Sequence, residues 1–466
     1  MWSGFTYFSI WAANFQAGRI NGEDILFSFE GSHNPLYGHG HGHITVLNQN
    51  YETIKELRAG NHRLSDKHEF HIKDEKTGLI QIYQPTAVDL SEWASSRRQQ
   101  WVVDAIFQEL DIETGELLFE WSSLDHVSPS DSVLDVDIGQ AGAGFNSSDA
   151  WDYFHINSVD KDEHGDYLIS ARNAASLFKI SGKTGEILWK LGGLPSITSS
   201  DFQTQNFNFS FQHHARFIES TPEKTVISFF DNSAEGSENR GGSEVRYNSH
   251  SSGKIIELDT INWTAKVLFN GVAPDNLLAK SQGSTHVLPN GNVLVNWGSE
   301  GAVTEFDSEE NPIFHAYLDS GELGEKVQNY RAFRYSWTGI PKEKIALYSE
   351  QDKDGVVSLY VSWNGDTQTK TWKFYSIDDA NEKTFIGESK RTGFETKYEA
   401  PKKFKGKVFV EALDAEDGFL GSSSQVKTVA IIKEISEDLK SSALPTISNK
   451  QVFRKFQSYF EWKDLN

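Results

Sequence analysis

A repeated strand-turn-strand unit is the feature that most restricts what this chain can fold into. The segments ELDIETGELLFEW, from Glu109, and FKISGKTGEILWKL, from Phe178, share a Thr-Gly-Glu turn flanked by alternating apolar positions. A turn between two alternating runs predicts a β-hairpin. Weaker copies begin at Ile44, Ile255 and Val303. The chain is therefore expected to be all-β and built from repeats.

Another hairpin precedes most of these units, and its first strand starts with or near a histidine. The segments are HEFHIKDEKTGLIQIY from His68, HINSVDKDEHGDYLISAR from His155, HHARFIESTPEKTVISFF from His213 and THVLPNGNVLVNWG from Thr285. Four similar strands per unit, repeated around an axis, are typical of β-propeller blades. The units we draw are residues 1–65, 66–124, 150–193, 207–270 and 280–320, with a sixth completed by YRAFRYSW from Tyr330. The repeats alone allow five or six blades, with the N-terminus as a candidate closing strand.

The pattern changes near Ile345 to short alternating strands, with Trp363 and Trp372 available for a core between two sheets. Strands of this length and spacing predict a small sandwich similar to a fibronectin III module. We expect a propeller over residues 1–340, the sandwich over 345–432 and a tail over 433–466. Helical spacing predicts a short helix in that tail, at Val452, Phe456, Tyr459 and Phe460.

Composition excludes several classes of function. The formal net charge is −22, from 66 acidic and 44 basic residues, and no basic stripe interrupts it. Such a chain repels nucleic-acid backbones and anionic membrane surfaces, so we expect no nucleic-acid partner. The absence of cysteine excludes disulfides, thiol nucleophiles and thiolate metal sites. No run approaches the roughly 20 apolar residues of a membrane span.

The first residues do not read as a signal peptide. Residues 1–16 lack a basic start and a clean apolar stretch, so they read as a strand. Two localisations stay open: the cytoplasm, or the secretory pathway if a leader precedes this sequence. The sequence leaves the oligomeric state open.

Histidines at the start of inner strands should meet near the axis of a propeller. An imidazole with an ordinary pKa of about 6.5 serves as a neutral nucleophile or as a general acid or base. Each histidine by itself fits a structural role in the channel wall equally well, whereas several that converge favour a functional site. The candidates are His68 or His71, His155, His213 or His214, and His286.

Arginines lie in or directly after the same strands. A guanidinium in the channel can hold a sulfate, a carboxylate or a phenolate by paired hydrogen bonds. The alternative is that some of these arginines pair with Asp111, Asp160 or Asp231 and hold neighbouring blades together. The arginines are Arg172, Arg216, Arg331 and Arg334.

Two segments suggest metal binding, but neither has the geometry of a known site. In YGHGHGH, residues 37–43, the histidines ligate one ion only if the strand is extended and a further ligand approaches, and the glycines suit close backbone packing equally well. The acidic segment 131–137 lacks the spacing and the glycine of an EF-hand. Phosphate-binding loops of the G-x-x-x-x-G-K type are missing. We expect no transition metal and no nucleotide cofactor.

Several segments resemble the fungal branch of the arylsulfotransferase-like (ASST) family. They are WVVDAIFQELDIETGELLFEWSSLDHV, YFHINSVDKDEHGDYLISAR, FSFQHHARF, ISFFDNS, LPNGNVLVNWGSEG, YRAFRYSWTG and YVSWNGDTQ. The resemblance extends from Met1 to about Gly421 and implies a six-bladed propeller. It also implies catalysis without a cofactor, since bacterial members pass sulfate between phenols through a channel histidine.

By position, the resemblance implies that His286 is the nucleophile and that His155 and His214 assist it. It implies that Asn157 and Arg216 hold sulfate oxygens. Arg172, His71 and Arg331 complete the expected substrate-binding set, on their positions in the inner strands.

Two enzyme functions and one non-enzymatic function are compatible with this sequence. The scaffold is also similar to that of fungal hetero-Diels-Alderases, which join a tropolone quinone methide to a terpene, although no motif here is specific to them. Our preferred interpretation is cofactor-independent cyclisation of an aromatic natural-product intermediate. The alternative is nucleotide-independent aryl sulfotransfer through a sulfated His286. A binding propeller without activity is the third possibility.

Overall fold

The structure is a computed structural model that describes residues 2–4, 7, 8, 10–136, 141–235, 245–319, 327–400 and 404–430. The chain divides into two compact units. Unit 1 comprises Met1–Glu343 with Asn364–Gln368, and unit 2 comprises Lys344–Trp363 with Thr369–Asn466. The C-terminal helix expected within residues 433–466 lies outside the described residues.

The prediction of an all-β protein is confirmed. Within the described ranges the chain contains strands and short 3-10 turns but no α-helix. The turns are Pro129–Asp131, Ser147–Asp149 and Gly298–Glu300. Consequently, the described part of the chain has no helix that is long and apolar enough to cross a membrane.

The described residues of unit 1 form five large sheets, of which four are four-stranded and antiparallel and one has five strands. The first contains β1 (Trp11–Ile20), β2 (Glu23–His33), β3 (Gly40–Leu47) and β4 (Thr53–Leu57). The second contains β5 (Phe70–Lys73), β6 (Thr77–Ala87), β7 (Trp101–Asp111) and β8 (Leu117–Ser122). The third contains β9 (Ile156–Lys161), β10 (Tyr167–Ala171), β11 (Ser176–Ile180) and β12 (Ile187–Gly192).

The fourth sheet contains β14 (His213–Ser220), β15 (Lys224–Asp231), β18 (Ser252–Asp259) and β19 (Thr264–Gly271), with β13 (Gln203–Thr204) added in parallel to β19. The fifth contains β20 (Ser284–Val287), β21 (Val293–Asn296), β22 (Ala302–Phe306) and β23 (Pro312–Tyr317). In a separate two-stranded sheet, β16 (Ala234–Glu235) pairs antiparallel with β17 (Val245–Arg246).

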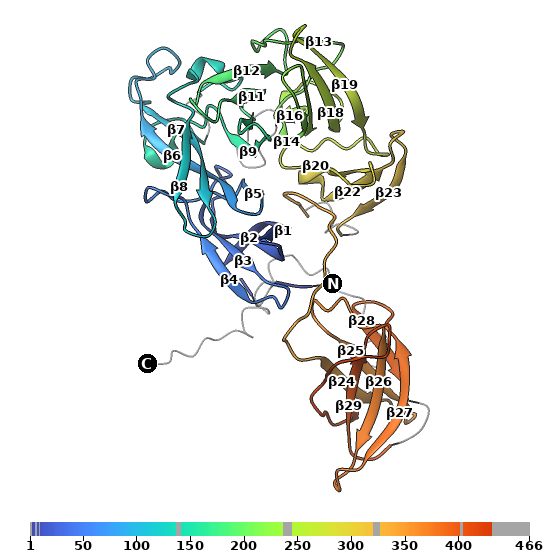
Figure 1. The fold of residues 1–466 in the computed structure, drawn as a ribbon. Coiled ribbons are helices and arrows are strands. Elements are labelled where there is room, and N and C mark those ends of the chain that lie inside the picture. The colour runs from blue at the N-terminus through green and yellow to red at the C-terminus, as the bar shows by residue number, and fades with distance from the viewer. Residues whose placement is uncertain are drawn as a thin grey trace, which may run out of the picture. The chain divides into compact units, whose positions relative to one another are not determined.

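The sheets stand around a common centre, with the first strand of each sheet innermost (Figure 1). These first strands contact one another in turn, β1 with β5, β5 with β9, β9 with β14, and β14 with β20. Apolar side chains fill the space between neighbouring sheets: Phe27 and Ile80 share one core, and Phe107 and Phe178 share the next. This radial arrangement is that of propeller blades.

The segment expected to complete a sixth unit, Tyr330–Trp337, forms no strand. Residues 327–345, which the structure describes, contain no strand. The backbone of this segment bonds elsewhere instead. The Gly283 N–H donates to Tyr330 O at 3.0 Å, and the Arg334 N–H donates to His286 Nδ1 at 3.3 Å. Because these backbone N–H and C=O groups bond to other segments, YRAFRYSW does not form a β-ladder despite its alternating pattern.

Unit 2 consists of two four-stranded sheets with one shared core. Trp363 and Trp372 lie in that core, as the sequence suggested, and Trp372 is 1% exposed. One sheet contains β24 (Ala346–Gln351), β25 (Val357–Ser362), β28 (Glu395–Glu399) and β31 (Val429–Ala430). The other contains β26 (Thr371–Ile377), β27 (Lys383–Lys390), β29 (Lys407–Leu413) and β30 (Phe419–Ser422).

Candidate active site in the channel of unit 1

Histidines from adjacent blades line one cavity of about 140 Å³ in unit 1. His68 lies just before β5, His155 just before β9, and His213 at the start of β14. His155 has a φ of 58°, in the left-handed region that a residue with a side chain adopts only when its surroundings impose it. Its carbonyl accepts a hydrogen bond from the Arg172 N–H at 2.9 Å. We call this cavity the histidine cavity.

The Nδ1 atom of each of these histidines lies against a hydrogen-bond acceptor. His155 Nδ1 is 2.5 Å from Asp152 Oδ2, and His68 Nδ1 contacts Asp66 Oδ1. His213 Nδ1 is 2.7 Å from Asn232 Oδ1. The amide nitrogen of Asn232 donates to carbonyls, so its oxygen is the acceptor.

A neutral imidazole that donates from Nδ1 keeps a lone pair on Nε2. No hydrogen bond joins the Nε2 atoms of His68, His155 and His213 to the described residues that surround them. The cavity therefore contains imidazole nitrogens in the state that a nucleophile or a general base requires.

Burial keeps these rings uncharged. It lowers the pKa of His155 and holds the pKa of His68 and His213 well below the usual 6.5. Burial alone would raise the pKa of Asp152, but the His155 and His39 rings outweigh it and hold that pKa far below its usual value. Asp152 is thus a carboxylate beside a neutral His155 at pH 7.

The same cavity is lined by two cationic side chains, Arg172 and Lys67, and by one acidic residue, Glu235. Arg172 donates from Nη1 to Asn173 Oδ1 at 2.8 Å, which fixes the guanidinium at the wall. Lys67 Nζ lies 5.6 Å from the ring of Trp11 and 5.3 Å from that of Tyr330. Neutral imidazoles beside these cations suit a small anion.

A second group of aromatic side chains, outside the histidine cavity, contains His214 and His286. Both rings lie 5.4 Å from the ring of Phe333, and His286 is also 5.2 Å from Tyr335. The Arg334 N–H donates to His286 Nδ1, so the neutral ring carries its proton on Nε2. Burial, with a smaller effect of Arg216, lowers the pKa of His286 to about 4.

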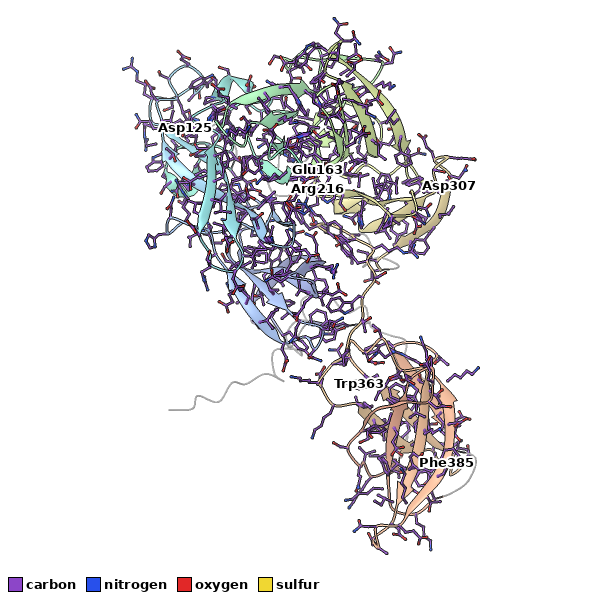
Figure 2. The ribbon with its side chains drawn as sticks, viewed as in Figure 1. Asp125, Glu163, Arg216, Asp307, Trp363 and Phe385 are labelled. Atoms are coloured by element: carbon purple, nitrogen blue, oxygen red, sulfur yellow. The ribbon has the colours of Figure 1, made fainter. Side chains whose placement is uncertain are left out.

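A buried ion cluster involves residues near both groups. Arg331 Nη1 and Arg216 Nη2 each lie 2.8 Å from a carboxylate oxygen of Glu69. Arg331 also donates from Nη2 to Asn157 O at 2.7 Å. Figure 2 shows Arg216 near the middle of the ring of sheets. Arg331 follows Tyr330, which lines the histidine cavity, and precedes Phe333, which contacts His214 and His286.

Only some of the residues predicted for the site line the histidine cavity. His155 and Arg172 line the histidine cavity, whereas His214 and His286 lie together elsewhere, so the single cavity expected for the three histidines differs from the structure. Of the paired candidates, His68 lines the cavity and His71 does not, and His213 lines it and His214 does not. Successive side chains on a strand face opposite sides, and the sequence does not show which side a strand presents inward.

The remaining predicted residues take part in contacts within the protein. His71 Nε2 lies 3.2 Å from Asp160 Oδ1, and Asn157 Nδ2 donates to Gln212 O at 2.7 Å. Arg216 and Arg331 pair with Glu69 rather than with the aspartates considered for them. Sequence reasoning missed Lys67, Asp66, Asp152 and Tyr330; an aspartate two or three residues before a channel histidine is the signal that identifies Asp66 and Asp152.

One group in the described residues has ligand atoms close enough for a metal, namely His39, Asp152 and His155, within 4.8 Å of one another. His155 Nδ1 and Asp152 Oδ2 are only 2.5 Å apart. Metal-ligand bonds of about 2.0–2.2 Å normally place adjacent ligand atoms farther apart than this. The distance is that of a short hydrogen bond to a charged acceptor.

The rest of the YGHGHGH tract is not part of that group. His41 is exposed, and His43 Nε2 lies 3.8 Å from Glu30. The glycines of the tract allow close packing of strands: a Cβ at Gly42 would lie 2.1 Å from Glu30 O. Close backbone packing therefore explains Gly40 and Gly42.

The fold and this cavity define an all-β protein whose propeller-like sheets enclose a histidine-lined channel. The family described as Arylsulfotransferase (ASST) matches residues 16–318. The chain therefore belongs to the arylsulfotransferase family, which confirms the resemblance at the level of the family.

A search of the curated proteins gave no match. Among solved structures, a protein of unknown function from Bacteroides caccae is 11% identical, with 88% of this chain and 98% of that chain covered and a TM-score of 0.30. Virginiamycin B lyase from Staphylococcus aureus is 9% identical, with 77% and 84% covered and a TM-score of 0.28. TM-scores this low establish neither a shared fold nor a shared activity.

Proposed function

We propose that this protein is an enzyme that transfers a sulfuryl group between small phenolic molecules without a nucleotide donor, and that His155 carries the group. The observation that supports this most is the Asp152–His155 pair, with 2.5 Å between Oδ2 and Nδ1, at the wall of a cavity that also contains two cations. Membership of the arylsulfotransferase family favours this activity over the cyclisation preferred from the sequence.

In the first half-reaction, the lone pair of His155 Nε2 attacks the sulfur of an aryl sulfate. An N–S bond forms, the S–O bond to the ring breaks, and the phenolate leaves with the electron pair and takes a proton from water. The ring then carries positive charge, which the Asp152 carboxylate stabilises through the Nδ1–H bond.

In the second half-reaction, the oxygen of an acceptor phenol attacks the sulfur and the N–S bond breaks, which restores neutral His155. The acceptor must lose its proton during this step. His68 or His213 can accept it, because their Nε2 atoms hold lone pairs in the same cavity. Arg172 and Lys67 are placed to hold the sulfate oxygens as their charge grows.

The residues of the second group receive other roles in this proposal. In the tautomer set by the Arg334 N–H, His286 Nε2 has no lone pair, so we do not assign it as the nucleophile. His214 and His286, with Phe333 and Tyr335, offer an aromatic surface that can contact a substrate ring. Arg216, Arg331, Asn157 and His71 then support the inner strands rather than contact the sulfate.

We also propose the finer architecture that the resemblance implied. Unit 1 would be a six-bladed propeller over residues 1–340, with Tyr330–Trp337 in the sixth sector. Hydrogen bonds from Ala332 N to Ser284 Oγ and from Tyr330 Oη to His68 O support this, since they join the segment to two blades. The sandwich over 345–432 would be similar to fibronectin III, followed by the tail over 433–466.

The experiment is a transfer assay on the purified protein, with 4-nitrophenyl sulfate as donor and phenol as acceptor. Nitrophenolate release is followed by absorbance, and phenyl sulfate is detected by mass spectrometry. We expect the wild type to make phenyl sulfate and His155→Ala to make none. His164→Ala is the matched control, since it removes an exposed imidazole, and it should keep the full turnover. His286→Ala tests the alternative nucleophile and should keep part of the turnover.

Two results would overturn the proposal. One is that the wild type transfers no sulfate to phenol or to any other phenolic acceptor, which would favour the cyclisation hypothesis. The other is that His286→Ala abolishes transfer while His155→Ala does not, which would return the nucleophile to His286.

A further inference from the structure

The loop between β2 and β3 forms one wall of the histidine cavity. Pro35, Leu36, Tyr37 and Gly38 all line that cavity. The loop is closed by its own hydrogen bonds: the Asn34 N–H donates to His39 O at 2.8 Å, and the Gly38 N–H donates to Asn34 O at 2.9 Å. Gly38 has a φ of 76°, which its lack of a side chain permits. Residues 34–39 therefore form a compact turn.

Two side chains fasten this turn to the segment that leads into β9. Tyr37 Oη donates to Asp149 Oδ1 at 3.0 Å. His39 Nε2 lies 2.9 Å from Asp152 Oδ2, and its ring stacks on Tyr83 with the centroids 4.3 Å apart. Both acceptors are carboxylates, and both lie in the sequence just before His155.

Asp152 joins the turn directly to His155. Its Oδ2 atom accepts from both His155 and His39, while its buried Oδ1 atom has no partner among the described residues. His39 therefore supplies one of the two hydrogen bonds that hold this buried carboxylate in place. If the turn moves away, Asp152 loses that bond and is less firmly oriented towards His155.

We infer that residues 34–39 are a lid over the histidine cavity, and that His39 is a positioning residue that couples closure of the lid to the orientation of His155. The lid itself is a property of the fold. Its effect on the rate rests on the proposed sulfotransfer.

The variants separate the hydrogen bond from the ring stacking. His39→Phe keeps a ring on Tyr83 and removes the donor, whereas His39→Gln keeps an N–H donor. Tyr37→Phe removes only the bond to Asp149. His41→Phe is the matched control, because His41 is an exposed residue of the same tract.

In the transfer assay, we expect His39→Phe to lower kcat by about 10 to 100-fold, the usual effect of removing a partner that orients a functional group. His39→Gln should recover most of that loss. A structural role in stacking alone predicts the reverse order, with His39→Gln the weaker enzyme. Thermal unfolding of each variant shows whether it is folded.

A second measurement needs no sulfate donor. Diethyl pyrocarbonate modifies neutral imidazoles, and peptide mapping gives the rate at His155 relative to the exposed His164. We expect Tyr37→Phe and His39→Phe to raise the relative rate at His155 several-fold, and His41→Phe to leave it unchanged.

The two proposals fail in different ways. If the lid variants speed modification of His155 but the wild type transfers no sulfate, the lid stands and the proposed function fails. If the wild type transfers sulfate but the lid variants change neither the modification rate nor kcat, the inference about the lid is wrong.

Discussion

Arg331 and Glu69 form an ion pair in the centre of unit 1, with 2.8 Å between Nη1 and Oε1, although 262 positions separate them in the sequence. Their side chains are 1% and 0% exposed. Burial alone would raise the pKa of Glu69, but the guanidinium groups of Arg216 and Arg331 outweigh it and lower that pKa. One carboxylate therefore pairs with two arginines from different parts of the chain.

Removing that carboxylate should be costly. We expect Glu69→Gln to lower the free energy of unfolding by about 3–5 kcal/mol, because it leaves buried guanidinium charge without its partner. Urea unfolding at pH 7 measures the change. The control is Glu52→Gln, which breaks an exposed pair with Lys342 and should cost at most about 1 kcal/mol. Equal losses in both variants would contradict the role given to Glu69.

The buried histidines predict how stability depends on pH. Burial holds the pKa of His68, His213 and His214 well below 6.5, so the unfolded chain binds more protons than the folded one between those values. The contribution of these neutral histidines to the free energy of unfolding is therefore complete above about pH 6.5 and decreases as the pH falls.

Urea unfolding between pH 8 and pH 5 measures this dependence. The pKa of Asp66 is raised from 3.8 by burial, so its contribution has the opposite sign. His214→Gln should make the decline below pH 6.5 shallower. Stability that is constant or increases from pH 7 to pH 5 would show that the rings are not buried in the neutral state.

Asp152 should matter more for catalysis than for folding. In Asp152→Asn, the amide can donate to His155 Nδ1, which moves the ring proton to Nε2 and removes the lone pair that attacks sulfur. We expect kcat to fall roughly 10² to 10⁴-fold. Asp149→Asn is the comparison, since Asp149 contacts Tyr37 and not His155. A similar kcat for Asp152→Asn and the wild type would contradict the proposed pair.

Arg172 should act mainly on the sulfate. Arg172→Gln keeps an amide near Asn173 but removes the positive charge from the cavity wall, so we expect kcat/KM for 4-nitrophenyl sulfate to fall by about 10 to 1,000-fold. Added guanidinium salts should restore part of the loss. Arg334→Gln is the control, because Arg334 pairs with Glu305 and does not line the cavity. An effect of Arg334→Gln as large as that of Arg172→Gln would contradict this assignment.

The repeats were sufficient to predict the sheets but not the face that each inner strand presents. The turns at Thr114 and Thr184 identified hairpins that the structure places between β7 and β8 and between β11 and β12. The register of β14 shifts between His213 and Arg216, and His214 has a φ of 58°. Simple alternation fails there, so the sequence could not select His213 over His214.

The sequence could not show that Tyr330–Trp337 forms no strand, for a different reason. Tyr330–Trp337 alternates as a strand does, but the Arg334 N–H bonds to His286, and Ala332 bonds to the side chain of Ser284. These partners are distant in the sequence and leave no local pattern. The contact of His39 with Asp152 could not be predicted from the sequence either, because the two residues are 113 positions apart.

The central claim is that His155 becomes covalently sulfated, and peptide mapping of the reacted enzyme tests it most directly. The wild type is mixed with 4-nitrophenyl sulfate without an acceptor and digested at neutral or alkaline pH to preserve the N–S bond, and its peptides are analysed by mass spectrometry. The account predicts one added sulfuryl group on the peptide that contains His155, lost on addition of phenol and absent from His155→Ala. A sulfuryl group on His286, or release of nitrophenolate without any sulfated histidine, would contradict it.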